Sequence, residues 1–366
     1  MNEFLNNFKI TTKIYASFAI ILGLLITISV FGAFNTKTIG GLFKDYRGTA
    51  KQSLLGNAIL EDVLEARLAA IKFQITDDKN FAREVEGNIN EVIAEEKKLH
   101  EIIKDEDSLL DLEKVMTDAN EYMDVFKKVE TLQNERNGIF KTITNAGTKM
   151  RKDLTQIRET AYRDGDIASA YYSAAAQERL LLARFYTFDF LVESEDSSKD
   201  RVITELEKAG AANQKLIDSL ENPERLKLAR NVDEMVKQYE ADFQDLVAVI
   251  KERNALSKDG LDKLGPEMLG LVDGVVENIT ERQNKIGPEA VTRIETTILS
   301  TIALAVICIA LGLAAALIIG RILSSSINTI TTDMNELAEG KLDVDIKGVD
   351  RKDDFGNMAR ALDVFK

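Results

Sequence analysis

EDVLEARLAAIKFQIT at residues 61–76 and ERLLLARFYTFDFLVE at residues 178–193 decide the fold, because the second segment repeats the first. The two align without a gap at a separation of 117 residues, and the same register continues until residue 137 meets residue 254. Sixteen of these 77 aligned positions are identical, whereas unrelated sequences would share about five. The sequence therefore predicts a domain built from two similar modules.

Apolar residues in both copies recur at spacings of three and four, which is typical of amphipathic helices. One stripe contains Leu60, Leu64, Leu68, Ile71 and Ile75, and the other contains Leu181, Phe185, Phe188 and Val192. Each stripe is expected to face the core of a helical bundle. With only three prolines in 366 residues, the chain is predicted to be all-α.

Five short runs rich in Asp, Ser, Gly or Pro interrupt this pattern and suit helix ends: 76–78, 105–108, 163–166, 194–198 and 221–223. They predict six helices, at 35–76, 79–104, 108–163, 167–193, 196–220 and 223–295. At about 1.5 Å per residue, these lengths fit two stacked four-helix bundles that share the third and sixth helices.

Two uncharged stretches, residues 14–34 and 296–320, are long enough to cross a bilayer. A cleaved signal peptide is the alternative for the first, but its apolar run is too long and no clear cleavage site follows. The sequence thus predicts two membrane spans around an extracytoplasmic domain at 35–295. Residues 1–13 and 321–366 are then cytoplasmic, and the cell membrane of a bacterium with a periplasm is the expected location.

Lys9, Lys13 and Arg321 flank the two spans on the side assigned to the cytoplasm, in agreement with the positive-inside rule. Cys308, the one cysteine, lies within the second span and is interpreted as an apolar filler. His100, the one histidine, is expected to be a solvated residue near a helix end. These counts exclude a disulfide framework and any metal site that needs several thiolates or two imidazoles.

The net charge of −14 argues against a nucleic-acid partner. No nucleophile–base pair, phosphate-binding loop or metal cluster can be assembled from the sequence. We therefore expect a protein that is not an enzyme and needs no cofactor.

Two equivalent arginines, Arg67 and Arg184, fall within the apolar stripes of the two copies. A guanidinium facing a bundle interior needs a partner, and its planar fork suits a carboxylate. Counting the rise along the predicted helices places Tyr122 level with Arg67, and Tyr239 level with Arg184. Each bundle is therefore predicted to hold one arginine and one tyrosine in a layer that could bind a small organic acid.

Room beside these arginines is expected at Gly265–Pro266 and Gly147. Asn90 near the first layer, and Asn145 and Thr148 near the second, could complete a polar pocket. The alternative is that each arginine reaches outward to solvent or pairs with a glutamate. The equivalent positions of the two arginines would then reflect only the common descent of the two copies. Glu135–Arg136–Asn137 and its copy, 252–254, fall where the bundles meet and are interpreted as structural ion pairs.

Two short apolar seams follow the second span and predict coiled-coil helices that need partners. They are Ile327, Ile330, Met334 and Leu337, and then Phe355, Met358, Leu362 and Phe365. Between them Gly340 ends a helix, and Leu342, Val344 and Ile346 alternate as in an extended connector.

This segment resembles the HAMP domain, a signalling relay that follows the second span of bacterial receptors. The resemblance rests on Leu337–Ala338–Glu339–Gly340 and on Asp353–Asp354–Phe355–Gly356 before Met358–Ala359. Asp354 stands where that family usually has Glu, and Ser325–Ser326 where it usually has proline.

The whole arrangement resembles methyl-accepting chemotaxis proteins, and the doubled bundle resembles the helical bimodular sensor domain. That resemblance implies a homodimer, a small organic acid ligand and cytoplasmic signalling partners. These would be reached through an output module that does not follow within the 366 residues. A histidine kinase or cyclic-dinucleotide enzyme as output, a receptor for a ligand-loaded periplasmic binding protein, and a mechanical spacer stay open as alternatives.

Overall fold

The computed structural model describes residues 8–366, so the predicted N-terminal segment 1–13 lies mostly outside the described residues. Every regular element among residues 8–366 is a helix, which confirms the all-α prediction. The first, α2, runs from Ile10 to Thr76, and the last, α9, runs from Asp354 to Phe365.

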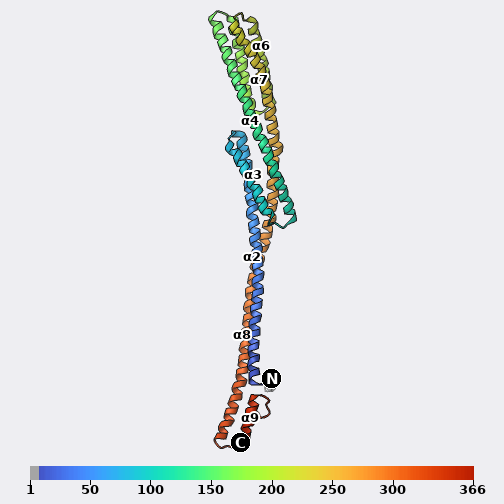
Figure 1. Cartoon of the computed structure of the whole chain (residues 1–366), viewed down its shortest axis with the longest axis vertical. Coiled ribbons are helices and arrows are strands. Elements are labelled where there is room, and N and C mark those ends of the chain that lie inside the picture. The colour runs from blue at the N-terminus through green and yellow to red at the C-terminus, as the bar shows by residue number, and fades with distance from the viewer. Residues whose placement is uncertain (1–7) are drawn as a thin grey trace. The chain divides into compact units, whose positions relative to one another are not determined.

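The remaining helices are α3 (Lys79–His100), α4 (Glu106–Arg163), α5 (Ile167–Glu193), α6 (Asp196–Ser219), α7 (Pro223–Leu256), the π-helical turn η1 (Ser257–Leu261) and α8 (Asp262–Ala338) (Figure 1). All five predicted breaks are present. Two details differ from the prediction: α3 ends at His100, and the sixth predicted helix is divided by the π-helical turn.

Side-chain caps start the following helix at four of the five breaks, and α6 begins without one. Asp78, Asp105 and Asp166 each accept a hydrogen bond from a backbone N–H in the first turn of the following helix. Asn222 does the same just before Pro223, a residue whose missing N–H costs nothing at the first helical position. These caps satisfy donors that a helix start leaves unpaired, so they fix where α3, α4, α5 and α7 begin.

Residues 51–280 form one compact unit with two hydrophobic cores. One core, which defines the first module, draws on α2, α3, the first half of α4 and the start of α8. The other, which defines the second module, draws on the second half of α4 and on α5, α6 and α7. α4 packs along α7 and passes through both modules, as the prediction of shared long helices requires.

The apolar stripes assigned to the core from the sequence are exposed. Leu68 on α2 is 52% exposed and Phe185 on α5 is 62% exposed, and the rest of each stripe is exposed as well, Leu60 excepted. The buried face of α2 is instead formed by Ile59, Val63, Ala66, Ala70 and Phe73. Both helices therefore carry two apolar faces. The prediction that the stripes quoted above face the core is wrong, because the core covers the other face.

The π-helical turn η1 changes the register of the repeat by one residue. Up to Asn254 the two modules match at a separation of 117, but beyond η1 the buried residues match at 118. Gly147 then corresponds to Gly265, and Met150 to Met268, all four buried. A single π turn accommodates one extra residue within a helix, so the two modules present the same faces despite the insertion.

A second unit comprises residues 1–50 and 281–366. Its parts of α2 and α8 each contain a stretch apolar and long enough to cross a membrane, with almost no residue buried within the structure. Beyond Ala338 the chain forms turns, with Ile346 buried and Leu342 exposed, and then enters α9. The predicted extended connector is therefore a series of turns rather than a strand-like segment.

Candidate functional site

Arg67 lies half-buried on α2, with its side chain pressed against α8 at Gly265. A methyl group on Gly265 would lie 2.6 Å from Cδ of Arg67 and 2.8 Å from its Nε. Glycine is therefore the residue that lets the arginine cross its neighbouring helix at this point. The room predicted beside Arg67 is present, and the arginine fills it.

Arg184 repeats this arrangement in the second module. It is half-buried on α5 and lies against Gly147 of α4, where an added methyl group would come within 2.9 Å of Cδ and 3.0 Å of Nε. Gly147 and Gly265 correspond across the repeat, so in both modules a glycine makes room for an arginine of the neighbouring helix.

Neither guanidinium has a hydrogen-bond or ion-pair partner among residues 8–366. The alternative that each pairs with a glutamate is therefore wrong in this structure. Two half-buried cations with free donors are suited to an incoming carboxylate, which would accept two parallel hydrogen bonds.

Tyr122 on α4 and Tyr239 on α7 are each 1% exposed, and each lies close enough to the arginine of its layer to feel its charge. Burial raises the pKa of both hydroxyls, and the guanidinium opposes that shift in each case. Both tyrosines are therefore protonated at neutral pH and able to donate a hydrogen bond. The structure brings together the two residues predicted for each layer.

The two tyrosines differ in their own hydrogen bonds. The Tyr239 hydroxyl lies 3.0 Å from Oγ1 of Thr187, which itself donates to the backbone oxygen of Ala183, so Tyr239 is the donor to Thr187. Alanine occupies the matching position in the first module, Ala70, and Tyr122 forms no hydrogen bond among the described residues. The Tyr122 hydroxyl is therefore free to donate to a ligand, whereas that of Tyr239 is engaged.

The three smaller residues predicted to complete the pocket contribute less. Asn90 on α3 and Asn145 on α4 are exposed, and the hydroxyl of Thr148 donates to the backbone oxygen of Thr144. The structure therefore leaves Arg67 with Tyr122, and Arg184 with Tyr239, as the centres of the two layers.

A cluster of acidic residues on α2 and α3 belongs to the first module. Burial raises the pKa of Asp62 to about 6, and the nearby carboxylates of Glu95 and Glu91 add to this shift. In the second module the matching position is Arg179, which pairs with Glu205 at 3.2 Å. The first module therefore carries unrelieved negative charge where the second has an ion pair.

The ion-pair role predicted for Glu135–Arg136–Asn137 and its copy is wrong. No residue of either triplet forms an ion pair with any described residue. Arg136 and Arg253 bond to amide oxygens instead.

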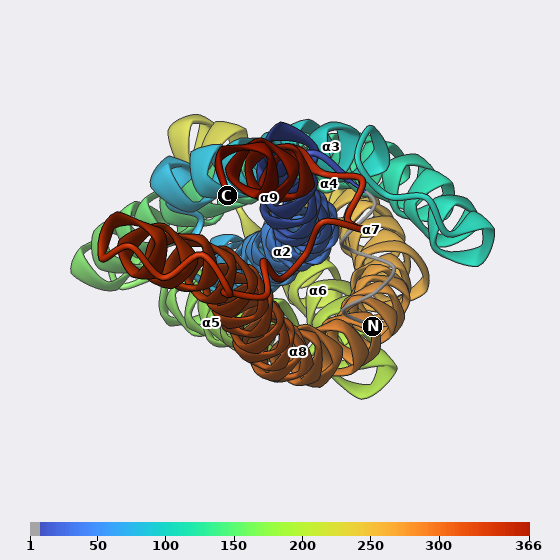
Figure 2. The ribbon, with the colours of Figure 1, turned by 90° about the horizontal axis from the view of Figure 1, so that it is seen from below.

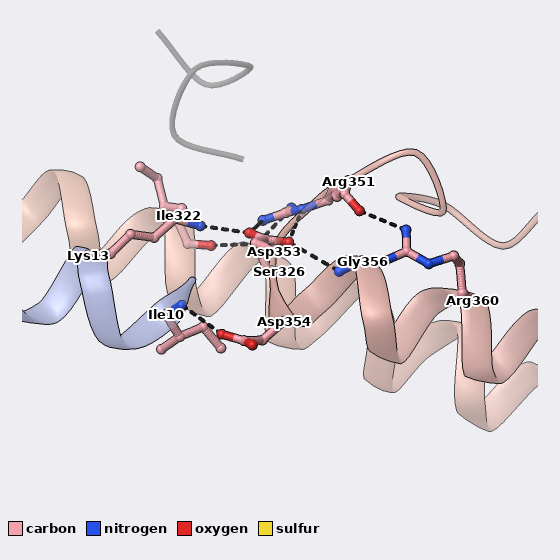
Figure 3. A network of polar contacts seen from close by, with 9 residues as sticks. All are labelled: Ile10, Lys13, Ile322, Ser326, Arg351, Asp353, Asp354, Gly356 and Arg360. Atoms are coloured by element: carbon pink, nitrogen blue, oxygen red, sulfur yellow. Dashed lines mark hydrogen bonds and ion pairs between the residues drawn. The ribbon is translucent and has the colours of Figure 1, made fainter. Parts of the chain in front are cut away.

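A network of polar contacts joins the start of α2 to the start of α9 (Figure 3). Nζ of Lys13 lies 2.7 Å from Oδ2 of Asp353, with the two side chains 4% and 0% exposed. Arg351 bonds to the same carboxylate and to Oγ of Ser326, while the N–H of Ile10 donates to Asp354. Figure 2 shows α9 beside the first turns of α2 from below.

Asp353 also explains the spacing of the Asp353–Gly356 motif. Its carboxylate accepts a hydrogen bond from the N–H of Gly356 and so caps α9. A methyl group at Gly356 would lie 2.0 Å from the backbone oxygen of Arg351, so glycine is required there. Burial by itself would raise the pKa of Asp353, but hydrogen bonds from Arg351, Lys13 and Gly356 lower it to about 2.

The described fold is thus an all-helical domain of two similar modules, each with an arginine near a buried tyrosine. Residues 56–285 match the family of the helical bimodular sensor domain, and the chain belongs to that family. A search of curated proteins finds no match to this chain. The family and the two apolar helices together indicate a transmembrane sensory receptor.

Proposed function

We propose that the protein is a chemotaxis transducer of the bacterial inner membrane, binding small organic acids in the periplasm through residues 35–295. The observation that carries this proposal is the pair of half-buried, unpartnered arginines, each beside a buried tyrosine. The first layer is the stronger candidate, because Tyr122 adds a free hydroxyl donor to the fork of Arg67. A carboxylate bound there would bridge α2 and α4 and would favour one packing of these helices over another.

The test is thermal unfolding of the full chain in nanodiscs against acetate, lactate, succinate and citrate. An acid present at a hundred times its dissociation constant should stabilise the receptor by about 2.7 kcal/mol. Arg67→Ala should abolish that shift for an acid bound in the first module, and Arg184→Ala for one bound in the second. The matched control is Arg230→Ala, which changes an exposed arginine of α7 that forms no hydrogen bond or ion pair with a described residue.

A panel of acids that leaves the unfolding temperature unchanged would refute direct sensing of carboxylates. Recognition of a ligand-loaded periplasmic binding protein would then be the better explanation. Retention of full affinity in both arginine variants would refute the site and leave organic-acid sensing intact.

The exposed stripes support the homodimer. Their members match one by one across the repeat, from Leu64 with Leu181 to Ile75 with Val192. Isolated apolar residues are common on protein surfaces, but a stripe repeated at the same four positions of each module marks an interaction surface. A second copy related by a two-fold axis would cover both stripes with the same two stripes of its own.

Mass photometry of the full chain in nanodiscs can test this surface. Leu68→Asp combined with Phe185→Asp should convert dimers to monomers. The control is Leu110→Asp, which changes a leucine of α4 that is 64% exposed and lies outside the stripes. Equal dimer fractions in both variants would contradict the assignment.

The cytoplasmic residues would relay the signal as a HAMP domain to an output module and its signalling partners. In support, Ile327, Met334 and Met358 of the predicted seams are half-exposed or more, as helices awaiting a partner would be. The capped turn at Asp353 and Gly356 gives the motif quoted for this resemblance a structural reason.

A further inference from the structure

Two arginines that the ligand layers do not use lie where the modules meet. Arg136 on α4 and Arg253 on α7 occupy equivalent positions of the repeat, on helices that pack along each other. Both are half-buried. Arg253 donates to Gln133, which lies one helical turn before Arg136 on α4, so the two guanidinium groups lie close together. In agreement, burial lowers the pKa of each arginine, and the positive charge of Arg136 lowers the pKa of Arg253 further.

Within the described part of the chain, these two arginines donate hydrogen bonds to neutral oxygens. Nη1 of Arg253 donates to Oε1 of Gln133 at 2.5 Å, and its Nε and Nη2 donate to Oδ1 of Asn254. Nη1 of Arg136 donates to Asn137 at 2.8 Å, while its Nε is buried and has no hydrogen-bond partner among the described residues. Among residues 8–366, no carboxylate lies within ion-pair distance of either guanidinium.

One carboxylate acts on this cluster from further away. Asp77, exposed at the end of α2, accepts a hydrogen bond from Asn137 and raises the pKa of Arg136 through its charge. The cluster thus holds two cations against one distant anion. Half-buried cations that repel each other are costly unless a counter-ion joins them.

We propose that a small oxyanion binds between Arg136 and Arg253, at the crossover of the two modules. The bound group is a phosphate, a sulfate or a carboxylate, since each offers several oxygens to guanidinium donors. One negative charge is enough to balance the excess charge of the two arginines and Asp77. Gln133, 3% exposed and already bonded to Arg253, fixes one side of the site.

The site is distinct from the layers at Arg67 and Arg184, so it does not depend on the function proposed above. Its two arginines belong to the long helices α4 and α7, and α7 continues through η1 into α8. An anion between them would hold these helices together at the point where the two cores separate.

Equilibrium dialysis of the full chain in phosphatidylcholine nanodiscs with radiolabelled inorganic phosphate tests the proposal, with empty nanodiscs as the blank for lipid headgroups. We expect one phosphate per chain, displaced by unlabelled sulfate or acetate according to which oxyanion the site prefers. R136Q and R253Q should each weaken binding at least tenfold. R67A, R184A and the exposed control R230Q should leave it unchanged.

Two results would overturn the proposal. One is the absence of bound phosphate and of any protection by sulfate or acetate against thermal unfolding at concentrations of about 10 mM, a weak limit for a specific site. The other is phosphate binding that survives in the R136Q/R253Q double variant. If a glutamine variant fails to fold, R136K and R253K keep the charge but lose the planar fork, and they should bind phosphate about threefold to tenfold more weakly.

Discussion

The ammonium group of Lys13, the fourth residue of α2, lies 2.7 Å from a carboxylate oxygen of Asp353, the residue that caps α9. The two residues are 340 positions apart in the sequence, and both side chains are almost completely buried. The contact therefore ties the start of α2 to the start of α9 within one compact unit of the chain.

Asp353→Asn should loosen α9. It removes the charge that Lys13 and Arg351 share, and breaking a buried ion pair on one side typically costs about 3 kcal/mol or more. Hydrogen exchange of residues 354–365 should then lose roughly a hundredfold in protection. Asp363→Asn, an exposed acid on the same helix without a partner in the structure, should change exchange little, and equal exchange in the two variants would contradict the prediction.

The same contact predicts a response to acid. The pKa of Asp353 is about 2 in the folded protein and about 3.8 when unperturbed. A group whose pKa is lowered by folding stabilises the fold above its unperturbed pKa, and that contribution disappears as the pH falls through the folded value. Protection of α9 should therefore be constant above pH 5 and fall between about pH 4 and pH 2, and a transition near pH 6 would argue against Asp353 as its origin.

Asp62→Asn should stabilise the first module at neutral pH. Here folding raises the pKa from 3.8 to about 6, so the favourable contribution is present below pH 3.8 and is lost as the pH rises through 6. Since Asp62 is only half-buried, we expect a gain of about 1 kcal/mol in unfolding free energy at pH 7.5 and less at pH 5. The control is Glu207→Gln, which removes one exposed negative charge from α6; an equal gain there would point to net charge alone.

Gly265→Ala separates ligand binding from stability. The added methyl group would lie 2.6 Å from Cδ of Arg67 and must displace that side chain, whereas alanine in a helix is favoured over glycine by about 1 kcal/mol. We expect the affinity for a carboxylate bound at Arg67 to fall about tenfold with little loss of thermal stability. Gly270→Ala, with no atom within 4 Å of its new methyl group, should keep full affinity. Isothermal titration of both variants with the acid selected by the panel measures the difference.

Tyr122→Phe and Tyr239→Phe should have opposite consequences. Tyr122 has no hydrogen bond among the described residues, so its loss should weaken ligand binding in the first module and leave the unfolding temperature nearly unchanged. Tyr239 bonds to Thr187, and removal of one buried hydrogen bond costs about 1 kcal/mol. Chemical unfolding and titration of each variant would test this, and a destabilised Tyr122→Phe protein would contradict it.

Helix boundaries could be predicted well because their signals are local. Asp78, Asp166 and Asn222 act as caps through contacts with residues two or three positions away. Helix lengths predict which residues share a level, and the structure has Arg67 against Gly265 and near enough to Tyr122 to act on it through its charge. Neither inference needs the rotation of one helix against another.

The parts that failed depend on that rotation. The helix α2 has an apolar face at Val63, Ala66 and Ala70 and another at Leu64 and Leu68, and periodicity cannot tell which one the core covers. The partners of Arg136 depend in the same way on how α4 meets α7. The sequence could therefore not show that Arg136 bonds to the amide of Asn137 rather than to a carboxylate. Whether the predicted site residues bind a ligand stays a prediction.

The π turn at Ser257–Leu261 has a consequence for how the duplicated gene could diverge. One added residue would normally swing everything after it by about 100° around the helix axis, which would have turned Gly265 and Met268 away from their neighbours. Confined to one widened turn, the added residue left the following core positions of α8, such as Gly265 and Met268, facing the first module as before. The turn thus records a difference in length between the two modules that the fold tolerates. It lies between α7 and α8, whereas α4 passes from one module to the other as a continuous α-helix.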